Sequence, residues 1–439
     1  MIHRDIYNSL INWRKESVPK PILLRGARQV GKSFIVNAFG TNEFDNIITI
    51  NFERNPEYKE LFTTNSPKVI IEKIMLLSGR EINAGTTLLF FDEIQECPEA
   101  ITSLRYFYEE RPGIHIIGAG SLLEFSLRSS NFKMPVGRIQ YLFMHPLSFN
   151  EFLGALGETH LQKFTTDFNN IKNIDPLIHN KLTELVRTYF ILGGMPAVIA
   201  EYVKNANILR CQKIQRSIID TYLDDFGKYS KATDFMTLRK LFYSAAKFTG
   251  EKFVYARVDN TQKTAVLKNA LNLLELAGVL IKIKRSTGDG IPLESNVKEN
   301  FFKILFLDIG LMNNINGSFN KIILEKDLSS SLKGSVAEQF VGQQLICHGN
   351  PWQKTALFYW AREAKNSSAE IDYLVEHNGF PLAIEVKSGN IKRMKSIMMF
   401  MEKYKPPYSL RVSQNTYCKD RNIYSIPFYG INSFLQSSL

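Results

Sequence analysis

An eight-residue motif near the N-terminus constrains the fold of this chain more than any other feature. The motif follows the pattern G-x-x-x-x-G-K-[ST], and its residues are Gly26, Ala27, Arg28, Gln29, Val30, Gly31, Lys32 and Ser33. It lies between an apolar run, Ile22–Leu24, and a segment with helical periodicity, Ser33–Phe39. In this context the glycines allow backbone N–H groups to surround phosphates at the N-terminus of a helix. The motif therefore predicts a parallel α/β sheet with a nucleotide site at its edge.

The last residues of the motif have separate expected roles. Lys32 is expected to bind the β- and γ-phosphates of ATP, and Ser33 to offer its hydroxyl to Mg²⁺. Phe34 follows them and is expected to border the nucleotide.

A second motif completes the expected site. The apolar run Leu88–Phe91 ends in Asp92 and Glu93, as in a Walker B segment. Asp92 would hold Mg²⁺, directly or through water, and Glu93 would act as general base on the attacking water. Ser121, just past the next strand, is expected to contact the γ-phosphate. Arg138 could neutralise transition-state charge within the chain or across a subunit boundary of a homo-oligomer, or could form a surface ion pair.

Residues 1–150 are assigned to this α/β core, because short apolar runs alternate there with helical patterns. The expected strands are Ile22–Leu24, Ile47–Phe52, Thr87–Phe91 and Ile114–Ile117. Residues 151–231 are expected to form a helical lid, with helices at Asn180–Ile191 and Leu209–Phe226.

Residues 232–330 have the pattern of a winged helix. Two helical segments, Phe235–Phe248 and Lys263–Leu276, precede the alternating strand Val279–Lys284 and a loop, Ser286–Glu299, that would be the wing. The residues that would read DNA are Lys263, Lys268 and Asn272. A winged helix that serves only as a packing module is the alternative.

Residues 331–439 are expected to form a mixed α/β domain. A helix, Val336–Cys347, precedes strands near 356–360, 370–376 and 382–386, and Asn378-Gly379 predicts a tight hairpin between the last two. A helix at Ile391–Tyr404 and two short strands would close the chain.

The arms of this hairpin carry a second group of candidate residues. Asp372, Glu385 and Lys387 resemble the D…E-x-K core of restriction-endonuclease-like nucleases, and Glu338 matches the additional acid of the resolvase branch. In such a site Asp372, Glu385 and Glu338 would bind Mg²⁺, and Lys387 would assist the water that the metal activates. The alternative is an exposed strand pair in which Lys387 bridges a carboxylate.

Several of these segments together resemble prokaryotic AAA-type ATPases that carry a C-terminal domain of unknown function related to Holliday junction resolvases. The segments are Leu24–Lys32, Phe91–Gln95, Gly120-Ser121, Gly137-Arg138, Pro146–Phe152, Phe190–Pro196, Lys303–Leu311 and Phe358–Trp360. The resemblance covers nearly the whole chain and implies ATP and Mg²⁺ but no particular substrate. Ala119 stands where the family often has threonine, so the γ-phosphate contact would depend on Ser121 alone.

Charge and composition narrow the partners and the compartment. Lys and Arg outnumber Asp and Glu by only 17 to 16 in residues 1–150, but by 37 to 27 in residues 151–439. This excess favours a polyanionic partner, DNA, for the C-terminal two thirds. The four cysteines stand far apart, the charged N-terminus does not resemble an export signal, and no apolar run is long enough to span a membrane. A cytoplasmic location without membrane contact is expected.

The sequence thus predicts a Mg²⁺-dependent ATPase of AAA type whose nuclease-like domain acts on DNA. Two alternatives remain open at this point. The chain could be an ATP-dependent regulator whose nuclease-like fold is only a scaffold, or a defence or signalling protein that uses ATP to control its oligomerisation.

Overall fold

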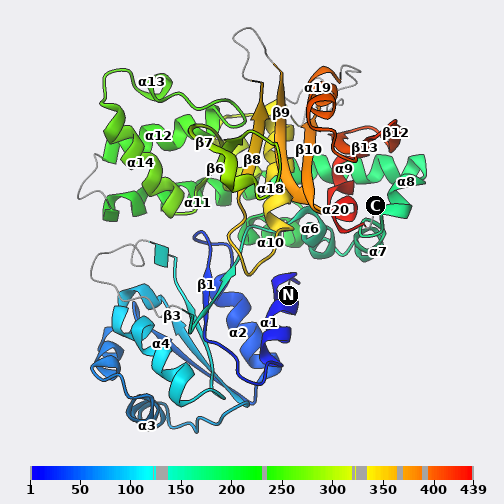
Figure 1. Ribbon diagram of the computed structural model, residues 1–439. Coiled ribbons are helices and arrows are strands. Elements are labelled where there is room, and N and C mark those ends of the chain that lie inside the picture. The colour runs from blue at the N-terminus through cyan, green and yellow to red at the C-terminus, as the bar shows by residue number, and fades with distance from the viewer. Residues whose placement is uncertain are drawn as a thin grey trace. The chain divides into compact units, whose positions relative to one another are not determined.

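The computed structural model describes residues 2–121, 123–124, 137–229, 235–318, 322, 334–362, 369–387 and 394–437. Their contacts divide the chain into two compact units (Figure 1). The N-terminal unit contains residues 3–145 and the short segment 350–354, and the C-terminal unit contains nearly all the rest. No helix within the described ranges is both long enough and apolar enough to cross a membrane.

A five-stranded parallel sheet forms the centre of the N-terminal unit. Its strands are β1 (Ile22–Arg25), β2 (Asn46–Asn51), β3 (Thr87–Asp92), β4 (His115–Ala119) and β5 (Gln140–Phe143), in the order β2-β3-β4-β1-β5. All four pairings are parallel, as predicted from the alternation of apolar runs and helices. The first four strands match the predicted runs to within one or two residues, whereas β5 was not predicted.

Helices cover both faces of this sheet (Figure 1). They are α1 (Ile6–Arg14), α2 (Lys32–Glu43), α3 (Pro67–Ser78) and α4 (Pro98–Glu110), with short 3₁₀ turns η1 (Pro56–Phe62) and η2 (Ile94–Glu96). Side chains alternate along a strand, so Leu89 and Phe91 of β3 face one side and pack on Ile70 of α3 and Leu104 of α4 in one buried cluster. The strands are buried on both faces and therefore appear in the sequence as continuous apolar runs.

The C-terminal unit begins with a series of helices. These are α6 (Phe149–Ala155), α7 (Thr159–Phe164), α8 (Phe168–Lys172), α9 (Pro176–Leu192), α10 (Pro196–Asn205), α11 (Ile208–Tyr229), α12 (Phe235–Lys247), α13 (Tyr255–Val258), α14 (Thr264–Leu276) and α15 (Ile309–Ile315). The predicted helices at 180–191 and 209–226 lie within α9 and α11. Helix α9 ends as expected, because Gly193 takes a positive φ of 71° there.

An eight-stranded mixed sheet completes this unit, in the order β12-β13-β11-β10-β9-β8-β6-β7. Its strands are β6 (Leu280–Ser286), β7 (Val297–Phe306), β8 (Leu357–Ala361), β9 (Glu370–His377), β10 (Phe380–Val386), β11 (Ser409–Ser413), β12 (Cys418–Asp420) and β13 (Ile423–Pro427). The helices around it include α18 (Gly334–Cys347), α19 (Lys395–Tyr404) and α20 (Ile431–Gln436).

The C-terminal unit differs from the expectation in three ways. Strand β6, predicted for a winged helix, pairs in parallel with β8, so the strands expected in two separate domains form one sheet. The apparent wing is shorter than predicted, since β6 continues to Ser286 and β7 begins at Val297. The chain also closes with three strands and a helix instead of two strands, and residues 391–393 of the expected helix lie outside the described ranges.

The hairpin between β9 and β10 agrees with the prediction. Asn378 and Gly379 have φ values of 47° and 84°, which are the positive values that such a two-residue turn requires. The antiparallel register places Ile384 opposite Tyr373, and hence Glu385 next to Asp372 on the same face.

Candidate functional site

The loop between β1 and α2 has a backbone that only glycine can adopt at two positions. Gly26 has a φ of 149°, and a Cβ atom there would lie 2.2 Å from the carbonyl oxygen of Met144. Gly31, at the start of α2, has a φ of 99°. Ala27 and Val30 are buried and fix the loop against the unit. The loop therefore leaves its backbone N–H groups available at the N-terminus of α2.

The Lys32 side chain folds back onto this loop. Its Nζ donates hydrogen bonds to the carbonyl oxygens of Gly26 at 2.9 Å and Ala27 at 2.8 Å. Burial lowers the pKa of Lys32 to about 8, and the nearby carboxylates of Glu93 and Asp92 oppose this shift. Nucleotide phosphates would replace the two carbonyl groups as partners of the ammonium group.

Asp92 lies at the end of β3 and contacts the motif directly. The Ser33 hydroxyl donates to Asp92 Oδ1 at 2.9 Å, and the Asn51 amide donates to Asp92 Oδ2 at 3.0 Å. Burial raises the pKa of Asp92, while the Ser33 hydrogen bond lowers it. These adjacent oxygen donors fit Mg²⁺, which binds one or two protein oxygens beside phosphates and water. Asn51, which ends the neighbouring strand β2, was not identified from the sequence.

Glu93 is held by two polar residues. Its backbone is left-handed, with a φ of 49°, and its Oε2 accepts hydrogen bonds from Gln95 Nε2 at 2.7 Å and from the Ser121 backbone N–H at 3.3 Å. The structure thus brings Ser121 to the expected general base. Gln95 had no recognised role in the sequence, although it lies two residues after Glu93 on the same loop.

Arg138 and Phe34 lie at the surface of the unit. Arg138 Nε donates to Glu109 Oε1 of α4 at 2.9 Å, so here it forms the surface ion pair that was the alternative to a catalytic role. Its role in catalysis stays a prediction. Phe34 is 59% exposed and so does not belong to the core.

The C-terminal unit brings together four carboxylates, which we call the carboxylate cluster. Its members are Glu338 of α18, Glu370 and Asp372 of β9, and Glu385 of β10. Asp372 Oδ2 accepts from the Val386 backbone N–H at 2.7 Å. Lys387 Nζ lies 2.9 Å from Glu385 Oε1, as in the alternative in which this lysine bridges a carboxylate.

Lys303 of β7 occupies the middle of this cluster. Its side chain is 1% exposed, and its Nζ lies 2.6 Å from Glu370, 3.3 Å from Glu338 and 3.7 Å from Asp372. Burial alone would lower the pKa of Lys303, but the three carboxylates together raise it above its usual value. Burial raises the pKa of Glu338 to about 8. No sequence pattern connects Lys303 with these residues, which lie 35 to 69 positions further along the chain.

The carboxylate cluster does not fit the Mg²⁺ ion that the sequence suggested for Glu338, Asp372 and Glu385. An ammonium group already lies where a metal would contact Glu338 and Asp372. Glu385 Oε1 is taken up by Lys387, and its Oε2 has no hydrogen-bond partner among the described residues. Within the described ranges, no three His, Cys, Asp or Glu side chains are arranged to hold a metal ion.

The candidate DNA-reading residues of the predicted winged helix are only partly available. Lys263 and Lys268 are exposed at α14. Asn272 is half-buried, and its Oδ1 accepts from Lys282 Nζ at 2.9 Å. The predicted reading of bases by these residues therefore depends on the two lysines.

Comparison with known families agrees with the geometry of the nucleotide site. Residues 18–153 match the model of an AAA domain. Residues 183–321 and 333–429 match two domains of unknown function, DUF8612 and DUF4143. The N-terminal unit is thus an AAA-type P-loop ATPase domain, whereas the two families that match the rest carry no functional description.

Similarity to individual proteins is low. No curated protein matches the chain. A Walker-type ATPase of Pyrococcus abyssi is 18% identical, with 72% of this chain and 96% of that chain covered and a TM-score of 0.46. The ORC2 protein of Aeropyrum pernix is 11% identical, with 73% and 92% covered and a TM-score of 0.34.

Proposed function

We propose that this chain is a Mg²⁺-dependent ATPase whose nucleotide state controls the binding of DNA by its C-terminal unit. The observation that carries the proposal is the convergence of Lys32, Ser33, Asp92 and Glu93 at the ends of β1 and β3. The excess of basic residues in 151–439 supports DNA as the partner.

The residues of the nucleotide site divide the work of hydrolysis. Lys32 leaves the loop carbonyl groups to bind the phosphates, and the backbone N–H groups at the start of α2 surround them. Ser33 and Asp92 would hold Mg²⁺, which neutralises phosphate charge when bound. Glu93 leaves Gln95 and accepts a proton from the attacking water. Ser121, which contacts Glu93, is placed to couple this movement to the γ-phosphate.

The C-terminal unit is proposed to bind DNA without cutting it. Lys303 neutralises carboxylates that a nuclease would use for its metal. Of the hypotheses that the sequence left open, we therefore favour an ATP-dependent regulator whose nuclease-like fold is an inactive scaffold. A buried lysine between three carboxylates is also costly to move, because each unpaired charge would remain in a poorly solvated site.

One assay tests both parts of this proposal. ATP hydrolysis is measured with Mg²⁺ in the absence and presence of linear, single-stranded and junction DNA, and the DNA is then recovered and sized. We expect hydrolysis that changes with DNA, and DNA of unchanged length. If the wild type cleaves DNA and Glu385→Ala does not, the C-terminal unit is a nuclease. If DNA neither binds nor changes hydrolysis, a protein that uses ATP to control its oligomerisation becomes the better hypothesis.

A further inference from the structure

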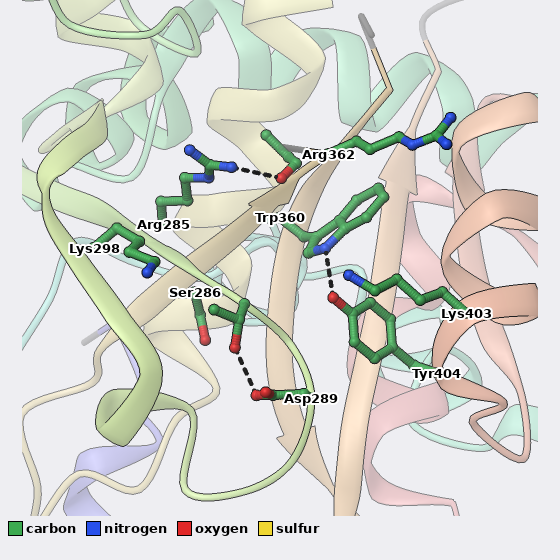
Figure 2. Close-up of a pocket in the computed structure, with 10 residues that line it drawn as sticks. Arg285, Ser286, Asp289, Lys298, Trp360, Arg362, Lys403 and Tyr404 are labelled. Atoms are coloured by element: carbon green, nitrogen blue, oxygen red, sulfur yellow. Dashed lines mark hydrogen bonds between the residues drawn. The ribbon is translucent and has the colours of Figure 1, made fainter. Parts of the chain in front are cut away.

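A cavity of about 260 Å³ opens in the C-terminal unit where β6, β8 and α19 end and β7 begins (Figure 2). The side chains that matter here are Arg285, Lys298, Trp360, Arg362, Lys403 and Tyr404, and we call this site the basic pocket. Its walls come from four separate elements, so the tertiary structure alone brings these residues together.

Among the described residues, more basic than acidic side chains line the basic pocket. Four basic side chains line it against a single acid, Asp289. That carboxylate already accepts hydrogen bonds from Thr287 Oγ1 at 2.5 Å and Asn296 Nδ2 at 2.9 Å. Within the described part of the chain, Lys298, Arg362 and Lys403 form no ion pair.

Two lysines of the C-terminal unit that lie outside the pocket behave differently. Lys284, next to Arg285 on β6, pairs with Glu294 at 2.6 Å, and Lys240 of α12 pairs with Asp259 at 2.6 Å. Lys298, Arg362 and Lys403 thus differ from these two ion-paired lysines. Such charges repel one another unless an anion lies between them.

Hydrogen-bond donors also point into the basic pocket. Figure 2 shows Lys298 and Lys403 flanking the cavity, whereas Arg362 extends outward from the end of β8. Arg285 is fixed at the wall by a hydrogen bond from Nη2 to the Ala361 carbonyl oxygen at 2.9 Å. Tyr404 Oη accepts from Trp360 Nε1 at 3.2 Å, which leaves the phenol hydrogen for a ligand.

These features select a phosphate group and not a base. A phosphate oxygen accepts from lysine, arginine and phenol donors, and it carries the charge that the pocket lacks. The Trp360 ring is 3% exposed and therefore offers no face for a base to stack on.

The position of the pocket indicates that the phosphate belongs to a strand. Ala361 in its wall pairs with Glu370 of the carboxylate cluster across β8 and β9, so the pocket lies beside the nuclease-like site. The mouth has exposed cations on separate elements, which suits a polyanion that continues beyond the cavity better than a small enclosed ligand.

We infer that the basic pocket binds one backbone phosphate of a DNA strand, independently of base sequence. The inference rests on the proposed function, in which the C-terminal unit binds DNA, and it names the site of contact.

The test compares the full-length wild type with the double variant Lys298→Ala/Lys403→Ala. Binding of a fluorescent single-stranded oligonucleotide of about 20 nucleotides is measured at several salt concentrations. We expect affinity to fall at least about tenfold at low salt, and the slope of log affinity against log salt to fall by about 0.7, since the contact with one phosphate is lost. Unchanged thermal unfolding midpoints show that the variant is folded.

The matched control is Lys240→Ala/Lys284→Ala, which removes the same charge from two ion-paired lysines outside the pocket. It should change affinity by less than about threefold, because those ammonium groups are already neutralised. Equal losses of DNA affinity in both double variants would show that only the total charge matters, and would contradict the inference that the basic pocket binds DNA.

Three further outcomes separate this inference from the function on which it rests. If the wild type binds the oligonucleotide and Lys298→Ala/Lys403→Ala binds it with the same affinity, the inference about the basic pocket is wrong and the proposed function is unaffected. A wild type that does not bind the oligonucleotide overturns both. If inorganic pyrophosphate binds the wild type and not the variant, while both bind DNA equally, the pocket binds free phosphate compounds. That result contradicts the inference that it binds a DNA strand.

Discussion

At the scale of single residues, Lys32 and Glu93 have roles that experiment can separate. Lys32→Ala removes a charged donor to the phosphates, so nucleotide affinity should fall about 10- to 100-fold. Glu93→Gln keeps the shape and the contacts of the site but cannot accept a proton, so turnover should fall about 10²- to 10⁴-fold with affinity nearly unchanged. Nucleotide binding by calorimetry and phosphate release measure the two effects. Hydrolysis by Glu93→Gln at the wild-type rate would show that another group is the base.

Asp308 is a second residue with an unusual position. It is completely buried and accepts hydrogen bonds from the Gly194 N–H at 2.6 Å, the Leu311 N–H at 3.0 Å and Gln343 Nε2 at 3.1 Å. One carboxylate thus satisfies the turn between α9 and α10, caps α15 and contacts α18.

Asp308→Ala should lower the free energy of unfolding by about 3–5 kcal/mol, because three buried donors lose their acceptor. Asp308→Asn, which keeps one acceptor oxygen, should lose less. Burial raises the pKa of Asp308, so the folded chain favours the protonated carboxyl group. Its contribution to stability should therefore decline as the pH rises above the ordinary carboxyl range, a decline that Asp308→Asn removes. Urea unfolding of the wild type and of Asp308→Asn at pH 4 to 7 tests this, and parallel pH profiles of these two proteins would contradict it.

At the scale of elements, the carboxylate cluster depends on β7 lying beside α18 and β9. Lys303→Ala removes the buried cation that Glu338, Glu370 and Asp372 share, and should lower the free energy of unfolding by about 3–5 kcal/mol. The space left among the carboxylates should then accept Mn²⁺. We therefore expect Mn²⁺ to raise the unfolding midpoint of Lys303→Ala and not of the wild type.

Lys252→Ala is the control for this prediction. Lys252 also pairs with Glu370, at 3.1 Å, but its side chain is 57% exposed. Loss of an exposed pair should cost less than about 1 kcal/mol and create no metal response. If Mn²⁺ stabilises the wild type at the cluster, a metal ion can displace Lys303, and a nuclease again becomes the better hypothesis.

At the scale of the whole molecule, the segment 350–354 is notable because it leaves the C-terminal unit along the chain and packs within the N-terminal unit. The Phe143 N–H at the end of β5 donates to the Pro351 carbonyl oxygen at 2.8 Å. This segment is therefore a physical connection between the ATPase sheet and the chain that carries the carboxylate cluster.

Replacement of residues 350–354 by five Gly and Ser residues should leave ATP hydrolysis without DNA near the wild-type rate, because no residue of the nucleotide site is altered. The effect of DNA on hydrolysis should be lost, since a flexible segment no longer transmits a change between the units. Phosphate release with and without DNA measures both. A DNA response of wild-type size would show that coupling takes another route.

The sequence by itself determined the parts of this protein that depend on neighbours along the chain. The glycines and Lys32 of the phosphate loop, the strands β1 to β4, the end of α9 at Gly193 and the turn at Asn378-Gly379 all follow from periodicity and backbone preferences within a few residues. The tertiary structure alone decided that β6 joins β8, that Lys303 lies among the carboxylates and that the basic pocket forms. Strand pairing and the burial of a charge depend on groups that are distant in sequence, and no local pattern in the sequence encodes which of them will meet.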